Sequence, residues 1–159
     1  MFEKLFKRRR VRKIAKTGLN YQFDIKSITK ENITIGVFVV IKAHIIDQDL
    51  YLKNEPVEKI IEDNIQELFN KEVNKIVIDD FIPKMIDEPS YYTEYYKTYF
   101  YDNLKKLFFK IGLIIDELIV PEVIPPSILI DSYKKIKKAE SEREKRIEER
   151  MNELRKNSF

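Results

Sequence analysis

Residues 19–45 read LNYQFDIKSITKENITIGVFVVIKAHI, and this stretch decides the fold. Apolar and polar side chains alternate from Tyr21 to Lys26, which is the period of a strand with one buried face. We therefore predict a strand over residues 19–28. The polar residues 29–32 predict a turn, so a long β-hairpin is expected. In the second strand one face holds only apolar residues, namely Ile33, Ile35, Val37, Val39, Ile41, Ala43 and Ile45.

The opposite face of the second predicted strand is apolar in its middle, at Phe38 and Val40, so we expect it to need a cover or a neighbour. Gly36 lies on this face and is expected to mark a bulge or a close approach of two chains. His44, the single histidine of the sequence, lies near its end. A histidine with a hydrogen-bond partner and a structural role is the expectation there, ahead of a pH sensor.

Helical and extended patterns follow the hairpin. Apolar residues recur at helical spacing over residues 56–75, after Asn54-Glu55-Pro56, which is typical of a helix start with Asn54 or Glu55 as the cap. Residues 77–83 are β-prone, and we expect a short extended piece that ends in a loop at Pro83. A helix of about 22 residues is then predicted, with Ser90 as its cap and Gly112 directly after its end.

The last third of the chain predicts a strand and a long helix. Pro121 interrupts the strand expected at residues 113–124, which indicates an edge or a bulge because proline has no N–H to donate. Residues 127–159 lack glycine and proline and are mostly strong helix formers, so one helix is expected. Its apolar residues become sparse after Ala139, so it stands in solvent or finds a partner helix. The candidate contacts between copies are Tyr133, Ile136, Ile147, Met151 and Leu154. These apolar residues alone leave parallel and antiparallel pairing open.

Composition excludes several classes of function. The 159 residues suffice for one domain with a core and some extra helix. The absence of cysteine excludes disulfides, thiolate zinc sites and cysteine nucleophiles, and a single histidine excludes sites that need two imidazoles. Residues 32–41 form the longest run without a charge, half of what a bilayer-spanning helix needs, so no transmembrane segment is expected. The basic start lacks the apolar stretch of a signal peptide, so we expect a cytoplasmic chain.

The charge is distributed unevenly along the chain. Residues 1–16 carry a net charge of +7, residues 17–133 a net charge of −8 and residues 134–156 a net charge of +4. Two cationic ends around an anionic middle suit a chain that lies on anionic lipid, binds nucleic acid or packs head to tail with its own copies. Ends that are merely solvated are the simpler alternative.

Neither the carboxylates nor the tyrosines predict catalysis. Three adjacent pairs invite an acid–base or metal hypothesis: Asp79-Asp80, Asp87-Glu88 and Asp116-Glu117. Neighbours in an extended segment point to opposite faces, so these pairs are not expected to converge. With no glycine-rich phosphate loop and no nucleophile elbow, we predict a protein that is not an enzyme and holds no cofactor and no metal; a small hydrolase is the disfavoured alternative. The six tyrosines of residues 91–101 are expected to divide between core and subunit interface, ahead of a stacking platform.

The order of predicted elements resembles the SPFH or band 7 domain of stomatins, prohibitins and flotillins. Short motifs carry this resemblance, which spans residues 29–150, and each stands at the family's place in the order. They are the turn Thr29-Lys30-Glu31-Asn32 with Ile33-Thr34-Ile35, then Asp47-Gln48-Asp49, the helix end marked by Leu104, Leu107, Ile111, Gly112 and Leu113, then Val123-Ile124-Pro125-Pro126, and Ala139-Glu140-Ser141-Glu142-Arg143.

The resemblance implies a fold and a function. The fold would be α+β, with a flexible or amphipathic basic segment over residues 1–18, an SPFH-like core over residues 19–126 and a charged, coiled-coil-like helix over residues 127–159. The function would be that of a non-enzymatic, self-assembling, membrane-associated scaffold. Its partners would be further copies, an anionic membrane surface, and a membrane protease or another membrane protein that it recruits or regulates.

The basic N-terminal segment is the candidate membrane anchor. Apolar side chains beside a basic cluster attach peptides to anionic lipid, and each basic residue near the surface contributes about 1 kcal/mol. We expect peripheral binding on the inner face of the membrane, through Phe2, Leu5, Phe6, Lys7, Arg8, Arg9, Arg10, Arg12 and Lys13. The alternatives are a disordered basic tail, and a soluble adaptor or nucleic-acid-binding module, because lysine and arginine also neutralise phosphates. Nucleic acid is the less favoured partner, since the sequence shows no nucleic-acid-binding motif.

Overall fold

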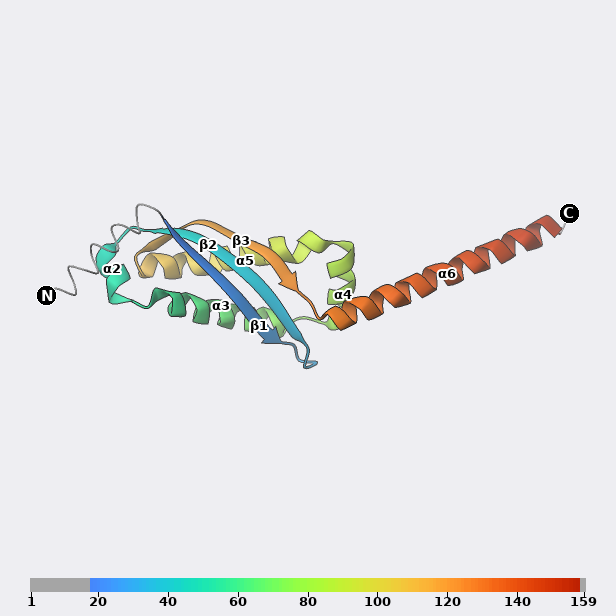
Figure 1. The fold of residues 1–159 in the computed structure, drawn as a ribbon, viewed down its shortest axis with the longest axis horizontal. Helices are drawn as coiled ribbons and strands as arrows, with labels where there is room; N and C mark the ends of the chain where they lie inside the picture. The colour runs from blue at the N-terminus through green and yellow to red at the C-terminus, as the bar shows by residue number, and fades with distance from the viewer. Residues whose placement is uncertain (1–17, 158–159) are drawn as a thin grey trace.

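The computed structural model describes residues 18–157 and is α+β, as predicted (Figure 1). Three antiparallel strands form one sheet in the order β1-β2-β3, with β1 at Leu19–Ile28, β2 at Thr34–Ile45 and β3 at Leu113–Ile124. Helix α3 (Val57–Val73) packs on β1 and helix α5 (Pro89–Lys110) packs on β3. A long helix, α6 (Ser127–Asn157), follows β3. The α+β class, the sheet and the long C-terminal helix are therefore confirmed.

The predicted hairpin forms with its expected turn. Leu19 pairs with Ala43 and Ile28 with Thr34, so the register runs the length of β1. In the turn, the N–H of Thr29 donates to the carbonyl of Ile33 at 2.9 Å, and the N–H of Ile33 donates back to Oγ1 of Thr29 at 3.1 Å. Asn32 has φ = 67° in the left-handed region, which asparagine tolerates better than most residues. This polar turn fixes which side chains of both strands face the helices.

The core lies between the sheet and the helices. Phe69 of α3 and Tyr96 of α5 meet edge to face with ring centroids 5.5 Å apart, and both are buried. The hydroxyl of Ser27 on β1 donates to the side-chain oxygen of Asn70 on α3 at 2.7 Å, which ties that helix to the sheet. The predicted inward face of β2 is buried at Ile35, Val37, Val39, Ile41 and Ala43.

The other face of the sheet turns away from α3 and α5, which lie behind it in Figure 1. Phe38 and Val40 are half-buried there, in the apolar middle that the sequence indicates. A Cβ atom on Gly36 would lie 3.4 Å from Cβ of Ile124, which is an ordinary van der Waals contact, so the bulge or close approach expected at Gly36 is not found. The bulges of this strand pair lie elsewhere.

Both bulges lie on β3, and the predicted edge position of Pro121 is confirmed. Val120 and Pro121 together oppose Val39 of β2, so the proline occupies a place where no ladder bond is required. Asp116 is a second extra residue, between the partners of Lys42 and Ala43. A bulged edge strand that contains proline is a poor template for strand addition.

The extended piece predicted at residues 77–83 is wrong, because helix α4 occupies Ile78–Asp87. Ile78, Phe81 and Ile82 are buried together, at the spacing of one helix face. Asp79 and Asp80 lie in the first turn, where negative charge suits the helix dipole. Helical periodicity therefore decides this segment over the β propensity of its residues and over Pro83, which lies inside the helix.

Helix starts also differ from expectation. A short helix, α2 (Gln48–Lys53), follows β2, and the carboxylate of Asp47 caps it by accepting from the N–H of Leu50 at 3.1 Å. Pro56 itself is the cap residue of α3, with no side-chain cap bond, so Asn54 and Glu55 do not play that role. Glu88, not Ser90, occupies the cap position of α5, with no side-chain cap bond, and Pro89 holds the first helical position, where a missing N–H costs nothing.

Gly112 joins α5 to β3 and ties both to β2. Its φ of 83° reverses the chain after Ile111, as the predicted helix end requires. Its carbonyl accepts from the N–H groups of Ile46, at 2.8 Å, and Asp47, at 3.2 Å. A Cβ atom here would lie 2.3 Å from the carbonyl oxygen of Asp47 and 2.9 Å from the backbone nitrogen of Tyr51. Only glycine fits this joint without displacement of the backbone.

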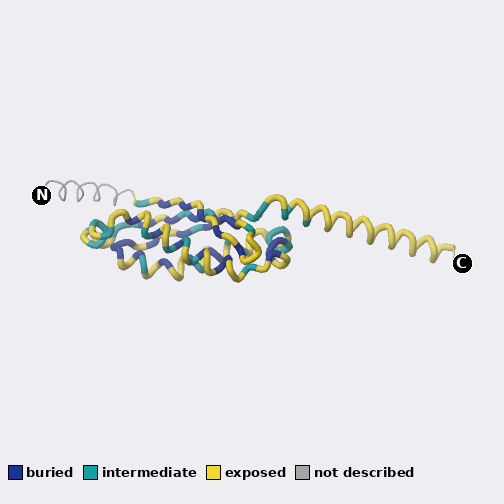
Figure 2. Tube along the Cα trace, turned by 90° about the horizontal axis from the view of Figure 1, so that it is seen from below, coloured by how far each residue is buried: buried dark blue, intermediate teal, exposed yellow. Residues whose placement is uncertain are grey.

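Helix α6 extends away from the core as a single rod (Figures 1 and 2). Its 31 residues span about 46 Å at 1.5 Å per residue. Leu129, Ile130 and Tyr133 in its first turns are half-buried against the core, and Nζ of Lys137 donates to the carboxylate of Asp87 at 2.7 Å. None of its described residues is buried. The core end that holds α2 and the start of β1 lies opposite the end from which α6 departs (Figure 1).

Replacing Gly112 by alanine should destabilise the fold by about 2–4 kcal/mol, because it adds a strained left-handed backbone to a clash with fixed main-chain atoms. Urea unfolding measures this change. Gly36→Ala is the matched control, because its Cβ finds ordinary contacts and its backbone is extended, and it should cost less than about 1 kcal/mol. Equal losses for the two variants would contradict the role given to Gly112.

Candidate functional site

The candidate contact residues of the C-terminal helix form a stripe along α6. Ile136, Ile147, Met151 and Leu154 are each more than half exposed, and Tyr133 is half-buried against the core. With 100° of rotation per residue, all five fall within one narrow sector of the helix surface. Figure 2 shows α6 exposed along its length beyond the first turns. The structure therefore brings the predicted residues together on one surface, which we call the α6 stripe.

The candidate membrane-binding residues, from Phe2 to Lys13, lie outside the residues that the structure describes. Within the described part of the chain, no helix combines the length and the apolar character needed to cross a bilayer.

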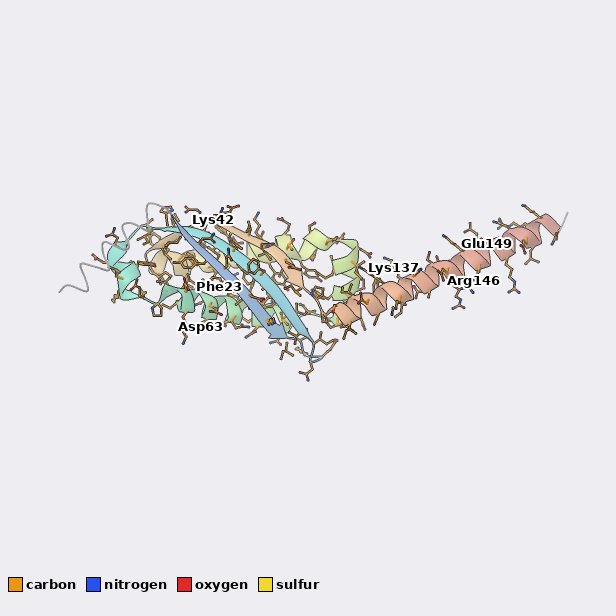
Figure 3. The ribbon with its side chains drawn as sticks, viewed as in Figure 1. Phe23, Lys42, Asp63, Lys137, Arg146 and Glu149 are labelled. Atoms are coloured by element: carbon orange, nitrogen blue, oxygen red, sulfur yellow. The ribbon has the colours of Figure 1, made fainter. Side chains whose placement is uncertain are left out.

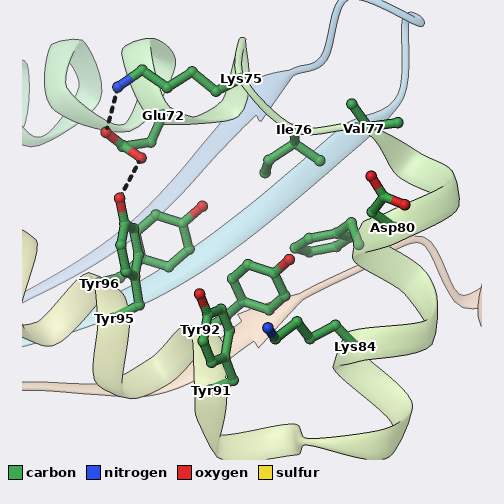
Figure 4. A pocket seen from close by; sticks show the side chains of 11 residues that line it. Glu72, Lys75, Ile76, Val77, Asp80, Lys84, Tyr91, Tyr92, Tyr95 and Tyr96 are labelled. Carbon is green, nitrogen blue, oxygen red and sulfur yellow. Dashed lines mark hydrogen bonds and ion pairs between the residues drawn. The ribbon is translucent and has the colours of Figure 1, made fainter.

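A second candidate site is a cavity, which lies where the end of α3, the helix α4 and the first turns of α5 meet (Figure 4). This cavity has a volume of about 420 Å³. Aromatic rings and aliphatic side chains form most of its wall, and two carboxylates and two ammonium groups complete it. The lining residues are Glu72, Lys75, Ile76, Val77, Asp80, Phe81, Lys84, Tyr91, Tyr92, Tyr95 and Tyr96.

Glu72 is the one acidic side chain among the buried residues of this region, at 7% exposure. Its carboxylate accepts from the hydroxyl of Tyr95 at 2.9 Å and from Nζ of Lys75 at 3.2 Å (Figure 4). These two donors satisfy a charge that would otherwise be costly to bury. The sequence prediction missed Glu72, although it lies three residues after Phe69, on the apolar face of α3.

Three tyrosines of the cavity, Tyr92, Tyr95 and Tyr96, have pKa values above the ordinary tyrosine value. Burial raises the pKa of Tyr95 to about 12, and the hydrogen bond to Glu72 and the charge of that carboxylate act in the same direction. Burial also raises the pKa of Tyr92 and of Tyr96. Phenols with raised pKa values are poor general bases, so the site is better suited to packing and hydrogen bonding than to proton abstraction.

The tyrosine run divides between interior and surface. Tyr96 is buried, whereas Tyr91, Tyr95 and Tyr101 are about two-fifths exposed. The rings of Tyr91, Tyr95 and Tyr99 are nearly parallel along α5, with successive centroids 6.4 and 6.3 Å apart. Nζ of Lys84 lies 3.8 Å above the ring of Tyr91, so an internal cation covers one end of this row. The predicted core role is confirmed for Tyr96, and an interface role for the exposed rings stays a prediction.

Two of the three carboxylate pairs, Asp87-Glu88 and Asp116-Glu117, lie beside cationic groups or an imidazole. Asp87 accepts from Lys137, and Glu88 lies 3.8 Å from Nζ of Lys84. Asp116 and Glu117 depart from the expectation that neighbours in a strand point apart: the bulge at Asp116 leaves both carboxylates exposed on the open face of the sheet.

Each of the two carboxylates on β3 meets a basic group of β2. Nδ1 of His44 donates to Asp116 at 2.6 Å, and Nζ of Lys42 lies 3.7 Å from Glu117. Figure 3 shows Lys42 at the end of the sheet opposite α6. The partner expected for His44 is thus present.

Among residues 18–157, no three acidic, histidine or cysteine side chains stand close enough to hold a metal ion. A scan against models of protein families finds none that matches this chain, and no curated protein matches its sequence.

Glu72→Gln should lower the pKa of Tyr95 from about 12, because it removes a negative charge that opposes ionisation of the phenol. The value should stay above 10, the ordinary tyrosine value, because burial persists. NMR titration of ring-labelled tyrosine measures it. Glu67→Gln, on the exposed side of the same helix, is the control and should leave Tyr95 unchanged.

Stability should fall as the pH rises above about 10. Tyr21, Tyr92, Tyr95, Tyr96 and Tyr99 all have raised pKa values in the folded state. Between the ordinary value and the raised one, the unfolded chain binds fewer protons than the folded chain, so the free energy of unfolding decreases with pH. Urea midpoints across this range measure the slope. Tyr95→Phe should make the slope shallower, and a midpoint independent of pH would contradict the raised values.

Proposed function

We propose that this chain is a non-enzymatic, membrane-associated scaffold subunit of the stomatin and prohibitin type, which self-assembles and recruits or regulates membrane proteins. The observation that carries the proposal is the α6 stripe. A rod of 31 residues with no buried side chain and with apolar residues on one side is expected to find a partner in an assembled state.

Most of the order of elements supports a core of the SPFH kind. The layout that the resemblance implies has a hairpin, a helix, a short β piece, a second helix that ends in glycine, a strand that ends before two prolines and a long charged helix. This chain has helix α4 in place of the short β piece. The open face of the sheet offers Phe38 and Val40 as a further half-buried surface on which copies could pack side by side. The membrane protease or membrane protein partner rests on the resemblance alone.

The charge layout supports attachment at one end and assembly at the other. The basic segment precedes β1, which begins at the end of the core away from α6. In the proposed arrangement, residues 1–16 hold the domain on an anionic cytoplasmic leaflet while α6 extends away from this attachment point. Lysine and arginine near an anionic surface supply the attraction, and salt screens it.

The site chemistry supports a binding protein over an enzyme. Tyr92, Tyr95 and Tyr96 of the cavity have raised pKa values, and Glu72 has two donors. Four carboxylates each lie beside a cationic group or an imidazole, namely Asp87, Glu88, Asp116 and Glu117. Charged groups that are paired in this way are typical of groups that stabilise a fold or lie at the edge of a binding surface. A soluble adaptor or nucleic-acid-binding module that shares this core remains the alternative outcome of the experiment below.

Flotation on liposomes tests membrane attachment. The intact protein should float with vesicles of phosphatidylcholine and phosphatidylserine, not with phosphatidylcholine alone, and the bound fraction should fall as salt rises. A chain lacking residues 1–16 should not float, and this truncation spares every element of the described fold. A full-length variant with glutamine at Arg8, Arg9 and Arg10 is the matched control for charge alone.

Two results would overturn the membrane role. One is that neither chain floats on anionic vesicles. The other is that the intact protein binds RNA or DNA with a steep salt dependence and leaves the vesicles, which favours the nucleic-acid-binding alternative.

A further inference from the structure

We propose that α6 pairs with α6 of a second copy of this chain as an antiparallel coiled coil, with the two-fold axis between Ser141 and Glu142. The inference rests on the proposed function, because it identifies the partner of the α6 stripe and the geometry of that partnership.

The side of α6 that carries the α6 stripe has the spacing of a coiled-coil seam, with Met151 of the stripe beside the seam and not in it. Side chains three and four residues apart follow one another along the whole helix, and at this alternation each inserts between residues of a partner helix. Most seam positions are apolar, but three charged residues interrupt them. The seam is Leu129, Tyr133, Ile136, Glu140, Arg143, Ile147, Arg150 and Leu154.

Parallel pairing in register brings like charges together. Each seam residue then faces its own copy, so Glu140 meets Glu140 and Arg143 meets Arg143 at the centre, and Arg150 meets Arg150 near the end. Like charges in contact are unfavourable, and these three layers separate the apolar ones. The charged residues that are tolerable on a solvated single helix therefore oppose a parallel pair.

Antiparallel pairing about the proposed axis gives every seam residue a complementary partner. Glu140 faces Arg143 of the second copy, and Ile136 faces Ile147. Further out, Tyr133 faces Arg150, a pair that allows a cation–π contact, and Leu129 faces Leu154. Each pairing occurs twice by symmetry, so one register satisfies all eight seam positions.

Neighbouring antiparallel registers lose this match. If the second helix slides by one heptad, so that the two-fold axis moves toward the C-terminus of α6, Arg143 faces Ile147. This pairing buries a charge against an apolar side chain. A shift in the other direction places Glu140 against Ile136. The charged residues therefore select one register, as polar seam residues do in other coiled coils.

The bounds of α6 fit the same register. With the axis between Ser141 and Glu142, Asn157 of the second copy lies level with Pro126, just before α6 begins at Ser127. The two described helices then overlap along almost their full length of about 46 Å.

The contacts of α6 with its own core leave the seam accessible from Ile136 onward, whereas Leu129 and Tyr133 at its start are half-buried against the core. Lys137 donates to Asp87 of α4, and this lysine lies beside the seam, not on it. In Figure 3, Lys137 lies by α4, whereas Arg146 and Glu149 extend into open space farther along the rod. Ile136, Ile147 and Leu154 are more than half exposed, so a second helix can cover them.

Cross-linking through single cysteines tests the orientation in the full-length chain, which has no cysteine of its own. Ile136→Cys and Ile147→Cys are prepared as separate proteins of different mass, one carrying a tag. Under oxidation, the mixture should form a disulfide heterodimer, because these positions face each other across the proposed axis. Each protein alone should not cross-link, because its cysteines lie about 16 Å apart along the rod, beyond disulfide reach. Cross-links within each single variant, with none between them, would establish parallel pairing and overturn the proposal.

A charge exchange tests the register. Glu140→Arg alone or Arg143→Glu alone should weaken the dimer at least about tenfold in sedimentation equilibrium, because like charges then face each other in the central layers. The double variant restores opposite charges and should recover the original dissociation constant to within about threefold. No recovery in the double variant contradicts the register.

The two proposals fail in different experiments. A chain that is monomeric at all concentrations and gives no mixed disulfide refutes the antiparallel pair, whether or not it floats on vesicles. A dimer that forms as described but never floats refutes the membrane role and leaves the pairing intact.

Discussion

The carbonyl of Gly112 is the point on which the rest of the fold depends. It accepts two N–H groups from the end of β2, and the left-handed backbone of the same residue turns α5 into β3. The third strand therefore starts in register with the second. α5 is consequently held against β3, and α4 and α6 take their places from α5 and β3. One residue without a side chain thus positions the sheet, the helix layer and the start of the rod.

Local sequence patterns predicted those elements in which the propensity of the residues and the spacing of the apolar side chains indicate the same structure. The alternation around Phe23 and Val39 gives the hairpin, and Gly112 marks the end of α5. The prediction failed at α4, where β-branched residues and Pro83 obscured the helical spacing of Ile78, Phe81 and Ile82. Propensity is a weak force of a few tenths of a kcal/mol per residue, and burial of one face outweighs it.

The candidate site follows a similar division. The exposed apolar residues of α6 could be selected from the sequence because few other large apolar side chains lie beyond the first turns of that helix. The cavity at Glu72 could not, because it is built from three helices whose mutual positions no local pattern contains. Glu72 could have been noticed as a charge on an apolar face with Lys75 three residues later, but its partner Tyr95 is identified only once α5 packs on α3. The bulge that places the carboxylate of Asp116 on the same face of the sheet as that of Glu117 likewise depends on pairing with β2.

The joint between α6 and the core has a mechanical consequence. Three half-buried side chains and one exposed ion pair, between Lys137 and Asp87, hold a lever of about 46 Å. A small rotation at such a fulcrum moves the far tip through a wide arc. An exposed ion pair is screened by salt, whereas the apolar contacts of Leu129, Ile130 and Tyr133 are not. Higher ionic strength therefore weakens the restraint on the orientation of α6 relative to the core, while the apolar contacts keep the helix attached.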